Sequence, residues 1–128
     1  MAVAVLCTGL LGILVFGLGL SVSLVRGSTR TNFGYSTDPT NRLYKLVRAH
    51  GNAAEYAPML AVLMLYLGSR GPGRGLIVAF IGATVFRYLH ALGMILSKSL
   101  DRPDPLRFVG ALGTYVTGLV LVIAMLGA

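Results

Sequence analysis

The first segment of the chain constrains the fold most, because residues 1 to 25 contain no charged side chain. A helix that crosses a bilayer needs roughly 20 consecutive apolar residues, and this segment is long enough. It has neither the basic start nor the small-residue cleavage site of a secretory signal peptide. We therefore expect the chain to begin with a transmembrane helix that is retained.

Three more helices are predicted after it. They span residues 39–68, which are polar at first and apolar from Tyr56 on, then 75–97, and finally the uncharged stretch 108–128. Polar or glycine-rich connections separate them, and Asp38-Pro39 resembles an N-cap followed by proline at the first helical position. The prediction is an all-α integral membrane protein, a four-transmembrane-helix bundle that forms one domain over residues 1–128.

Composition supports a membrane protein and excludes several other classes. Of the residues, 55% are hydrophobic and only 12% are charged, whereas soluble domains carry about 25% charged residues. The single cysteine, Cys7, allows neither a disulfide framework nor a cysteine metal site, and we expect no metal. The net charge is +7, but the basic residues form no dense run, so we expect no nucleic-acid partner.

The basic residues instead predict the orientation in the membrane. Four spans place both termini and the turn with Arg70 and Arg74 on one side. The opposite side holds the other basic residues: Arg26, Arg30, Arg42, Lys45, Arg48, Lys98, Arg102 and Arg107. By the positive-inside rule that second side is cytoplasmic, which leaves both termini on the non-cytoplasmic side.

Charged and polar side chains interrupt the second and third predicted helices. Arg48, Asn52 and Glu55 are spaced i, i+4, i+7 and share one face, and Arg87 and His90 lie in the third helix. At a rise of about 1.5 Å per residue, Glu55 lies about 20 Å from Gly68 and Arg87 about 18 Å from Gly75. Intramembrane charges normally pair inside a bundle, so we expect Glu55 and Arg87 to form an ion pair.

Two interpretations of these residues remain open at this point. The pair could simply tie the second and third helices together, although that leaves Arg48, Asn52, His90 and Arg107 without a role. Alternatively, arginines, one carboxylate and one amide suit a ligand with two carboxylates and an ammonium group. Glutathione is such a ligand.

The segment Arg-Ala-His-Gly-Asn-Ala-Ala-Glu-Tyr-Ala-Pro at residues 48–58 resembles the signature of the MAPEG family, the membrane-associated proteins in eicosanoid and glutathione metabolism. Phe-Arg-Tyr-Leu-His at 86–90 and Leu-Arg-Phe-Val-Gly at 106–110 extend the resemblance. With four spans of this size, it covers essentially the whole chain. The form is similar to bacterial members, so we expect the bacterial inner membrane.

The resemblance implies a homotrimer that binds glutathione between subunits, near the cytoplasmic side. By position, the ligand residues would be Arg48, Asn52, Glu55, Tyr56, Arg87 and His90, with Arg26 as a looser match. Arg107 would be the catalytic residue that stabilises the thiolate, and Arg102 is its rival because the connection before Arg107 is long. Departures from the eicosanoid-producing members, such as Met94 in place of a tyrosine, argue against those particular reactions.

The leading hypothesis is a membrane-bound, glutathione-dependent transferase or peroxidase that acts on a lipophilic electrophile. The acceptor would arrive from the bilayer through a groove between helices one and four. One alternative is a non-enzymatic lipid-binding protein, as found in one branch of the family. Another is a small four-helix exporter with a membrane carboxylate as proton carrier; such exporters carry that carboxylate in the first helix, which has no charge here.

Overall fold

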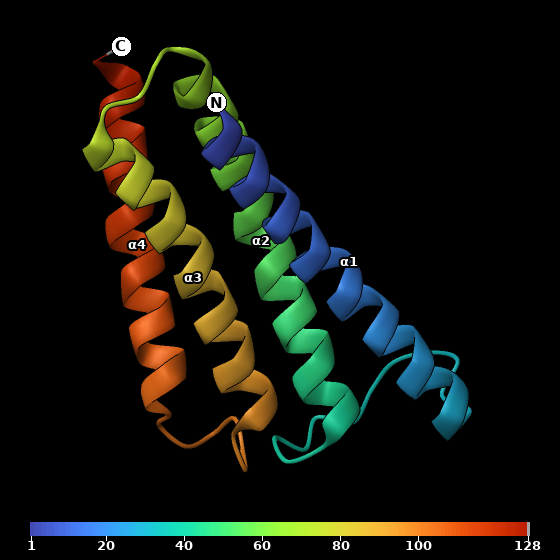
Figure 1. Ribbon diagram of the computed structural model, residues 1–128. Helices are drawn as coiled ribbons and strands as arrows, with labels where there is room; N and C mark the ends of the chain where they lie inside the picture. Colours follow the sequence, from blue (N-terminus) through green and yellow to red (C-terminus); the bar gives the residue numbers. More distant parts are fainter. Residues whose placement is uncertain (128) are drawn as a thin grey trace.

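The computed structural model describes residues 1–127, and all of its regular elements are helices. They are α1 (Ala2–Thr29), α2 (Arg42–Ser69), α3 (Arg74–Leu96) and α4 (Pro105–Leu126). Consecutive helices run antiparallel, so the N-terminus, the end of α4 and the α2–α3 turn lie together (Figure 1). The two longer connections lie at the opposite end, called here the loop end. The predicted all-α class and the order of four helices are confirmed.

The helices α2 and α3 occupy the middle of the bundle. Helix α1 packs mainly on α2, and α4 packs mainly on α3, as the ribbon shows (Figure 1). Within residues 1–127, α1 and α4 do not contact each other. A groove between helices one and four is therefore not formed within a single chain, and such a groove would need a second copy.

The core consists of three hydrophobic clusters along the bundle, and the two largest set the position of the middle helices. Toward the end that holds the α2–α3 turn, Met64, Phe80 and Leu121 are completely buried between α2, α3 and α4. The free thiol of Cys7 is buried in the same cluster. Toward the loop end, small residues such as Ala53 allow α2 to approach its neighbours. These contacts fix the rotation of α2 and α3, which decides the direction in which their polar side chains point.

Glycines bring α3 and α4 together with their backbones almost in contact. A Cβ added at Gly110 would lie 2.7 Å from the Cα of His90, and one at Gly113 would collide with the ring of Phe86. Only glycine therefore fits at these two positions of α4 without moving α3 away. By contrast, an added Cβ at Gly9, Gly12 or Gly17 of α1 meets nothing within 4 Å.

Helix α1 ends one turn later than predicted. The hydroxyls of Ser28 and Thr29 donate to the carbonyl of Val25 at 2.9 and 2.8 Å. Arg30 then adopts a left-handed conformation with φ of 51°, and its N–H caps the last turn. As a result Arg26 belongs to the last turn of α1 and not to the following loop.

The predicted start of the second helix was wrong by three residues. The Asp38 carboxylate accepts bonds from the Thr40 N–H and hydroxyl at 2.9 and 2.8 Å, which holds the pKa of Asp38 below its usual range. The cap is instead Asn41, whose side-chain oxygen accepts from the Tyr44 N–H at 3.1 Å. The Asp38 side chain is satisfied locally in a turn, so it does not reach the helix.

The outer surface of the bundle is strongly apolar. Phe16 on α1 is 79% exposed, and Phe108 and Ile123 on α4 are each 68% exposed. Three helices, α1, α3 and α4, are long and apolar enough to cross a bilayer. Helix α2 has the same length as α1, but its polar first half keeps it outside that class by composition.

Candidate functional site

The structure separates the predicted site residues into two groups. A central cluster, between α2 and α3, contains Asn52, Tyr56 and Arg87. A rim group, where α3 meets the start of α4, contains His90 and Arg107. The remaining predicted site residues, Arg26, Arg48 and Glu55, form no hydrogen bond with either group.

Arg87 organises the central cluster. Its side chain is only 1% exposed, and Nη2 donates to Asn52 Oδ1 at 2.6 Å. The guanidinium also lies over the Tyr56 ring, 5.0 Å from its centroid, a distance at which the ring attracts a cation. Its buried Nε–H has no hydrogen-bond partner, so one donor of this buried cation is unsatisfied.

The ion pair predicted between Glu55 and Arg87 is absent from the part of the chain that the structure describes. Arg87 is held by a neutral amide and an aromatic face, while the Glu55 side chain is exposed. The cause is helical rotation of about 100° per residue, which places Glu55 about 60° from Asn52 and Tyr56 about 40° from it on the other side. Equal depth in the bundle did not make the two charges face each other.

Tyr115 of α4 extends the central cluster, although no motif in the sequence singles it out as a site residue. The Tyr56 hydroxyl donates to the Tyr115 hydroxyl at 3.3 Å, and the two rings are 5.9 Å apart. Helical spacing within α4 gives no sign of this contact. Only the packing of α4 beside α2 brings the two tyrosines together.

A groove of about 320 Å³ runs between α2 and α4 beside this tyrosine pair. Glu55, Tyr56 and Tyr115 lie along it, and its other lining residues are mainly apolar: Met59, Leu60, Leu63, Thr114, Gly118, Leu119 and Val122. The groove therefore combines one carboxylate and two hydroxyls with a long apolar wall. This combination suits an apolar molecule that carries a polar group.

In the rim group, the side chain of Arg107 is directed toward the α3–α4 connection. Its guanidinium donates to the carbonyl of Leu100 at 3.0 Å and to that of Arg102 at 2.8 Å. Both acceptors are neutral, so the positive charge is not cancelled. Arg107, His90 and Asp104 line a groove of about 550 Å³ together with Pro103, Pro105, Phe108 and Ala111.

His90 is fixed by packing and by one hydrogen bond. It is 9% exposed, it packs against Gly110, and its Nδ1 lies 2.9 Å from the Arg107 carbonyl. The contact joins the end of α3 to the first turn of α4. His90 therefore positions the backbone that carries Arg107 and also contributes to the wall of the rim groove.

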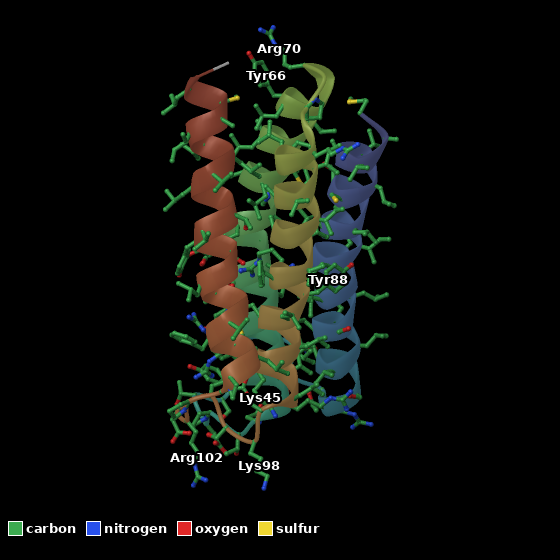
Figure 2. All side chains as sticks on the ribbon, turned by 60° about the vertical axis from the view of Figure 1, so that its left-hand side comes forward. Lys45, Tyr66, Arg70, Tyr88, Lys98 and Arg102 are labelled. Carbon is green, nitrogen blue, oxygen red and sulfur yellow. The ribbon has the colours of Figure 1, made fainter. Side chains whose placement is uncertain are left out.

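Two predicted ligand residues point elsewhere within one chain. Arg26 donates to the carbonyls of Thr31 and Gly34 at 3.3 and 2.8 Å, so it stabilises its own loop. Arg48 is exposed on the same α2 face as Glu55. The rival Arg102 is exposed at the loop end of the bundle, the end at which Figure 2 also labels Lys45 and Lys98.

A comparison with protein-family models matches residues 4–127 to the MAPEG family. The chain belongs to this family. No curated protein and no solved structure matches it. Because the match covers nearly the whole chain, the resemblance carried by residues 48–58, 86–90 and 106–110 is confirmed at the level of the family.

Membership in the MAPEG family and the three apolar helices make the chain an integral membrane protein. The family also associates it with glutathione. Within residues 1–127 there is no group of three or more His, Cys, Asp or Glu side chains that could hold a metal ion. The side chains that the structure gathers at the candidate site are arginines, tyrosines, a histidine, an amide and a carboxylate.

Proposed function

We propose that this MAPEG protein is a membrane-bound, glutathione-dependent transferase or peroxidase that acts on a lipophilic electrophile. The observation that carries the proposal is the buried Arg87, which Asn52 and Tyr56 hold without neutralising it and whose Nε–H lacks a partner. A buried cation with a spare donor is costly unless a ligand or a neighbouring subunit uses it.

The side chains present fit glutathione. Arg87 and Arg48 can donate to its two carboxylates, Glu55 can accept from its ammonium group, and Asn52 and Tyr56 can orient it. Arg26 and His90 complete the set only through the family pattern, since the structure gives them other contacts. Bound glutathione supplies a thiol, which either replaces a leaving group on an electrophile or, with a second thiol, reduces a peroxide to an alcohol and water.

The roles of the chain's own residues follow from their places. Arg107 keeps a net positive charge in a partly buried position, and such a cation favours the ionised form of a nearby thiol. We assign it as the catalytic residue, with Arg102 as its rival. The apolar α2–α4 groove beside Glu55 and Tyr115 can accommodate the lipophilic acceptor.

The same proposal includes the assembly and its orientation. Arg48 and Glu55 are exposed on α2, which we propose also crosses the membrane, in addition to α1, α3 and α4. Contact of these charges with lipid is unfavourable. Neighbouring copies in a homotrimer would cover them, and light scattering corrected for detergent measures the mass. The basic loop end favours a cytoplasmic location, with both termini on the other side of a bacterial inner membrane.

Titration of the detergent-purified protein with glutathione tests the function. Specific binding stabilises the folded state by mass action, so the melting temperature should rise with glutathione. Ophthalmic acid, which has a methyl group in place of the thiol, is the control: it should bind but support no conjugation or peroxide reduction. A protein that binds neither compound would be better described by the alternative, a lipid-binding protein that uses the α2–α4 groove.

A further inference from the structure

A cleft of about 470 Å³ lies where the loop ends of α1, α2 and α3 meet. Its walls are formed by Ser21 of α1, by Arg42, Lys45 and Leu46 of α2, and by Ile95 of α3. None of these residues belongs to the central cluster or the rim group. The cleft is therefore a separate feature of the bundle, and the glutathione hypothesis leaves its two cations unexplained.

Both cations of the cleft keep their charge. Lys45 is half-buried, and its Nζ donates to the backbone carbonyl of Ser97 at 3.0 Å, which is a neutral acceptor. Arg42 is exposed at the first position of α2, where the free N–H groups of the helix start add partial positive charge. No acidic side chain lines the cleft.

Arg42 also borders a second hollow, of about 250 Å³. Hydroxyl and amide side chains line that hollow: Ser28, Thr29, Thr31, Ser36 and Asn41. It too contains no acidic side chain. The hydroxyls of Ser28, Thr29 and Thr31 already donate to backbone carbonyls. The donors that the two hollows offer to an oxyanion are therefore the two cations, the Ser36 hydroxyl and the Asn41 amide.

Apart from Ser21 and the two cations, the walls of the cleft are apolar. Leu46 is 6% exposed and forms its floor together with Ile95. Beyond it, large apolar side chains on the outer faces of α1 and α3 are open to lipid, among them Leu24 at 65% and Leu96 at 68% exposure. Figure 2 shows Lys45 at the loop end, the end that holds the α1–α2 and α3–α4 connections.

We propose that this cleft binds the acidic head of a membrane amphiphile, with its alkyl chain against the apolar faces of α1 and α3. Arg42 and Lys45 supply the charge that complements a phosphate or carboxylate head, and basic residues at this depth attract anionic lipid. An anionic phospholipid of the bilayer and a free fatty acid share this chemistry. Both are amphiphiles, which distinguishes them from a soluble anion.

The test uses the whole protein in an uncharged detergent and measures lipid binding by native mass spectrometry. Phosphatidylglycerol should bind more tightly than phosphatidylcholine with the same acyl chains. The double variant Arg42→Gln/Lys45→Gln should lower phosphatidylglycerol affinity by about 25-fold, since each basic charge near a membrane surface is worth about fivefold. Lys98→Gln, an exposed lysine at the same end that does not line the cleft, is the matched control and should change little.

The variant Ser21→Phe distinguishes lipid binding in the cleft from attraction to the general surface charge, because it keeps both cations and fills the space beside them. Loss of phosphatidylglycerol binding in this folded variant supports the proposal. Oleate is tested in parallel. Whichever of oleate and phosphatidylglycerol binds more tightly shows whether the acidic head belongs to a fatty acid or to a phospholipid. Equal binding of phosphatidylcholine, binding of inorganic phosphate as tight as that of phosphatidylglycerol, unchanged binding in Ser21→Phe, or an equal loss in Lys98→Gln would overturn it.

Discussion

Two arginines of this chain, Arg87 and Arg107, have the same guanidinium group but lie in different surroundings. Arg87 is buried in the middle of the bundle, against an amide and an aromatic ring. Arg107 is half-exposed at the rim, where two loop carbonyls accept its hydrogen bonds. No carboxylate of residues 1–127 forms an ion pair with either arginine, so both remain cations.

The difference lies in what each cation costs and what it can do. A buried charge carries a large desolvation penalty, so removal of its polar partner affects stability. A cation at the rim costs little to keep, and its field in a partly dry groove can act on a developing negative charge. We therefore expect changes around Arg87 to affect folding and binding, and changes at Arg107 to affect turnover.

The largest effect is expected from Arg107→Gln, which keeps hydrogen-bond donors for the loop carbonyls but removes the charge. Turnover with glutathione and a lipophilic acceptor should fall by about 100-fold or more, the usual cost of losing one transition-state charge stabiliser. Glutathione affinity should change far less. Measurements of kcat and of glutathione binding separate the two quantities.

Arg102→Gln is the matched control for that variant and should do little. The ultraviolet absorbance of the thiolate, titrated against pH with glutathione bound, gives an independent readout in both proteins. If the thiolate persists without the charge of Arg107 and is lost without that of Arg102, the catalytic assignment passes to Arg102.

A smaller but still large effect is expected from Asn52→Leu. This change removes the hydrogen bond to the buried guanidinium of Arg87, and bonds to charged groups contribute about 1.5–3 kcal/mol. Thermal unfolding in detergent should show a lower melting temperature. Arg87→Met removes the buried charge itself, so Asn52 no longer has a cation to stabilise. This variant should therefore lose less stability than Asn52→Leu. Equal losses in the two variants would contradict our view of Arg87 as a cation that is costly to bury.

Glu55→Gln probes the same cluster from its exposed side. Because Glu55 has no ion pair within residues 1–127, the melting temperature without ligand should change little. Glutathione affinity should fall roughly tenfold, as expected for the loss of one charge-assisted hydrogen bond. A large loss of stability in the absence of glutathione would instead mean that Glu55 pairs with a cation of a neighbouring subunit.

The smallest effect is expected from Tyr115→Phe. Its hydroxyl accepts one bond from Tyr56 at 3.3 Å, which is long for an O–H···O contact, so the loss should be about 0.5–1 kcal/mol. Tyr56→Phe and the double variant complete a double-mutant cycle. A marked drop in turnover for Tyr115→Phe alone would place this hydroxyl in contact with the acceptor.

Much of the architecture could be predicted from local patterns. The uncharged run at residues 1–25 and the turn residues at 69–75 are sufficient to place the first helix and the α2–α3 turn. The predicted ends of helices were wrong where a polar side chain could form a hydrogen bond with either of two nearby groups. Asp38 bonds to Thr40 in place of the helix start, and the hydroxyls of Ser28 and Thr29 extend α1 through polar sequence.

The sequence by itself determined at what height along the bundle each polar side chain lies, because a helix advances by a fixed rise per residue. It did not determine which way they point. That direction depends on how each helix is rotated about its axis, and contacts such as Gly110 against His90 and Phe86 against Gly113 set that rotation. Only the tertiary structure could therefore turn Arg87 toward Asn52 and away from Glu55, and bring Tyr115 to Tyr56.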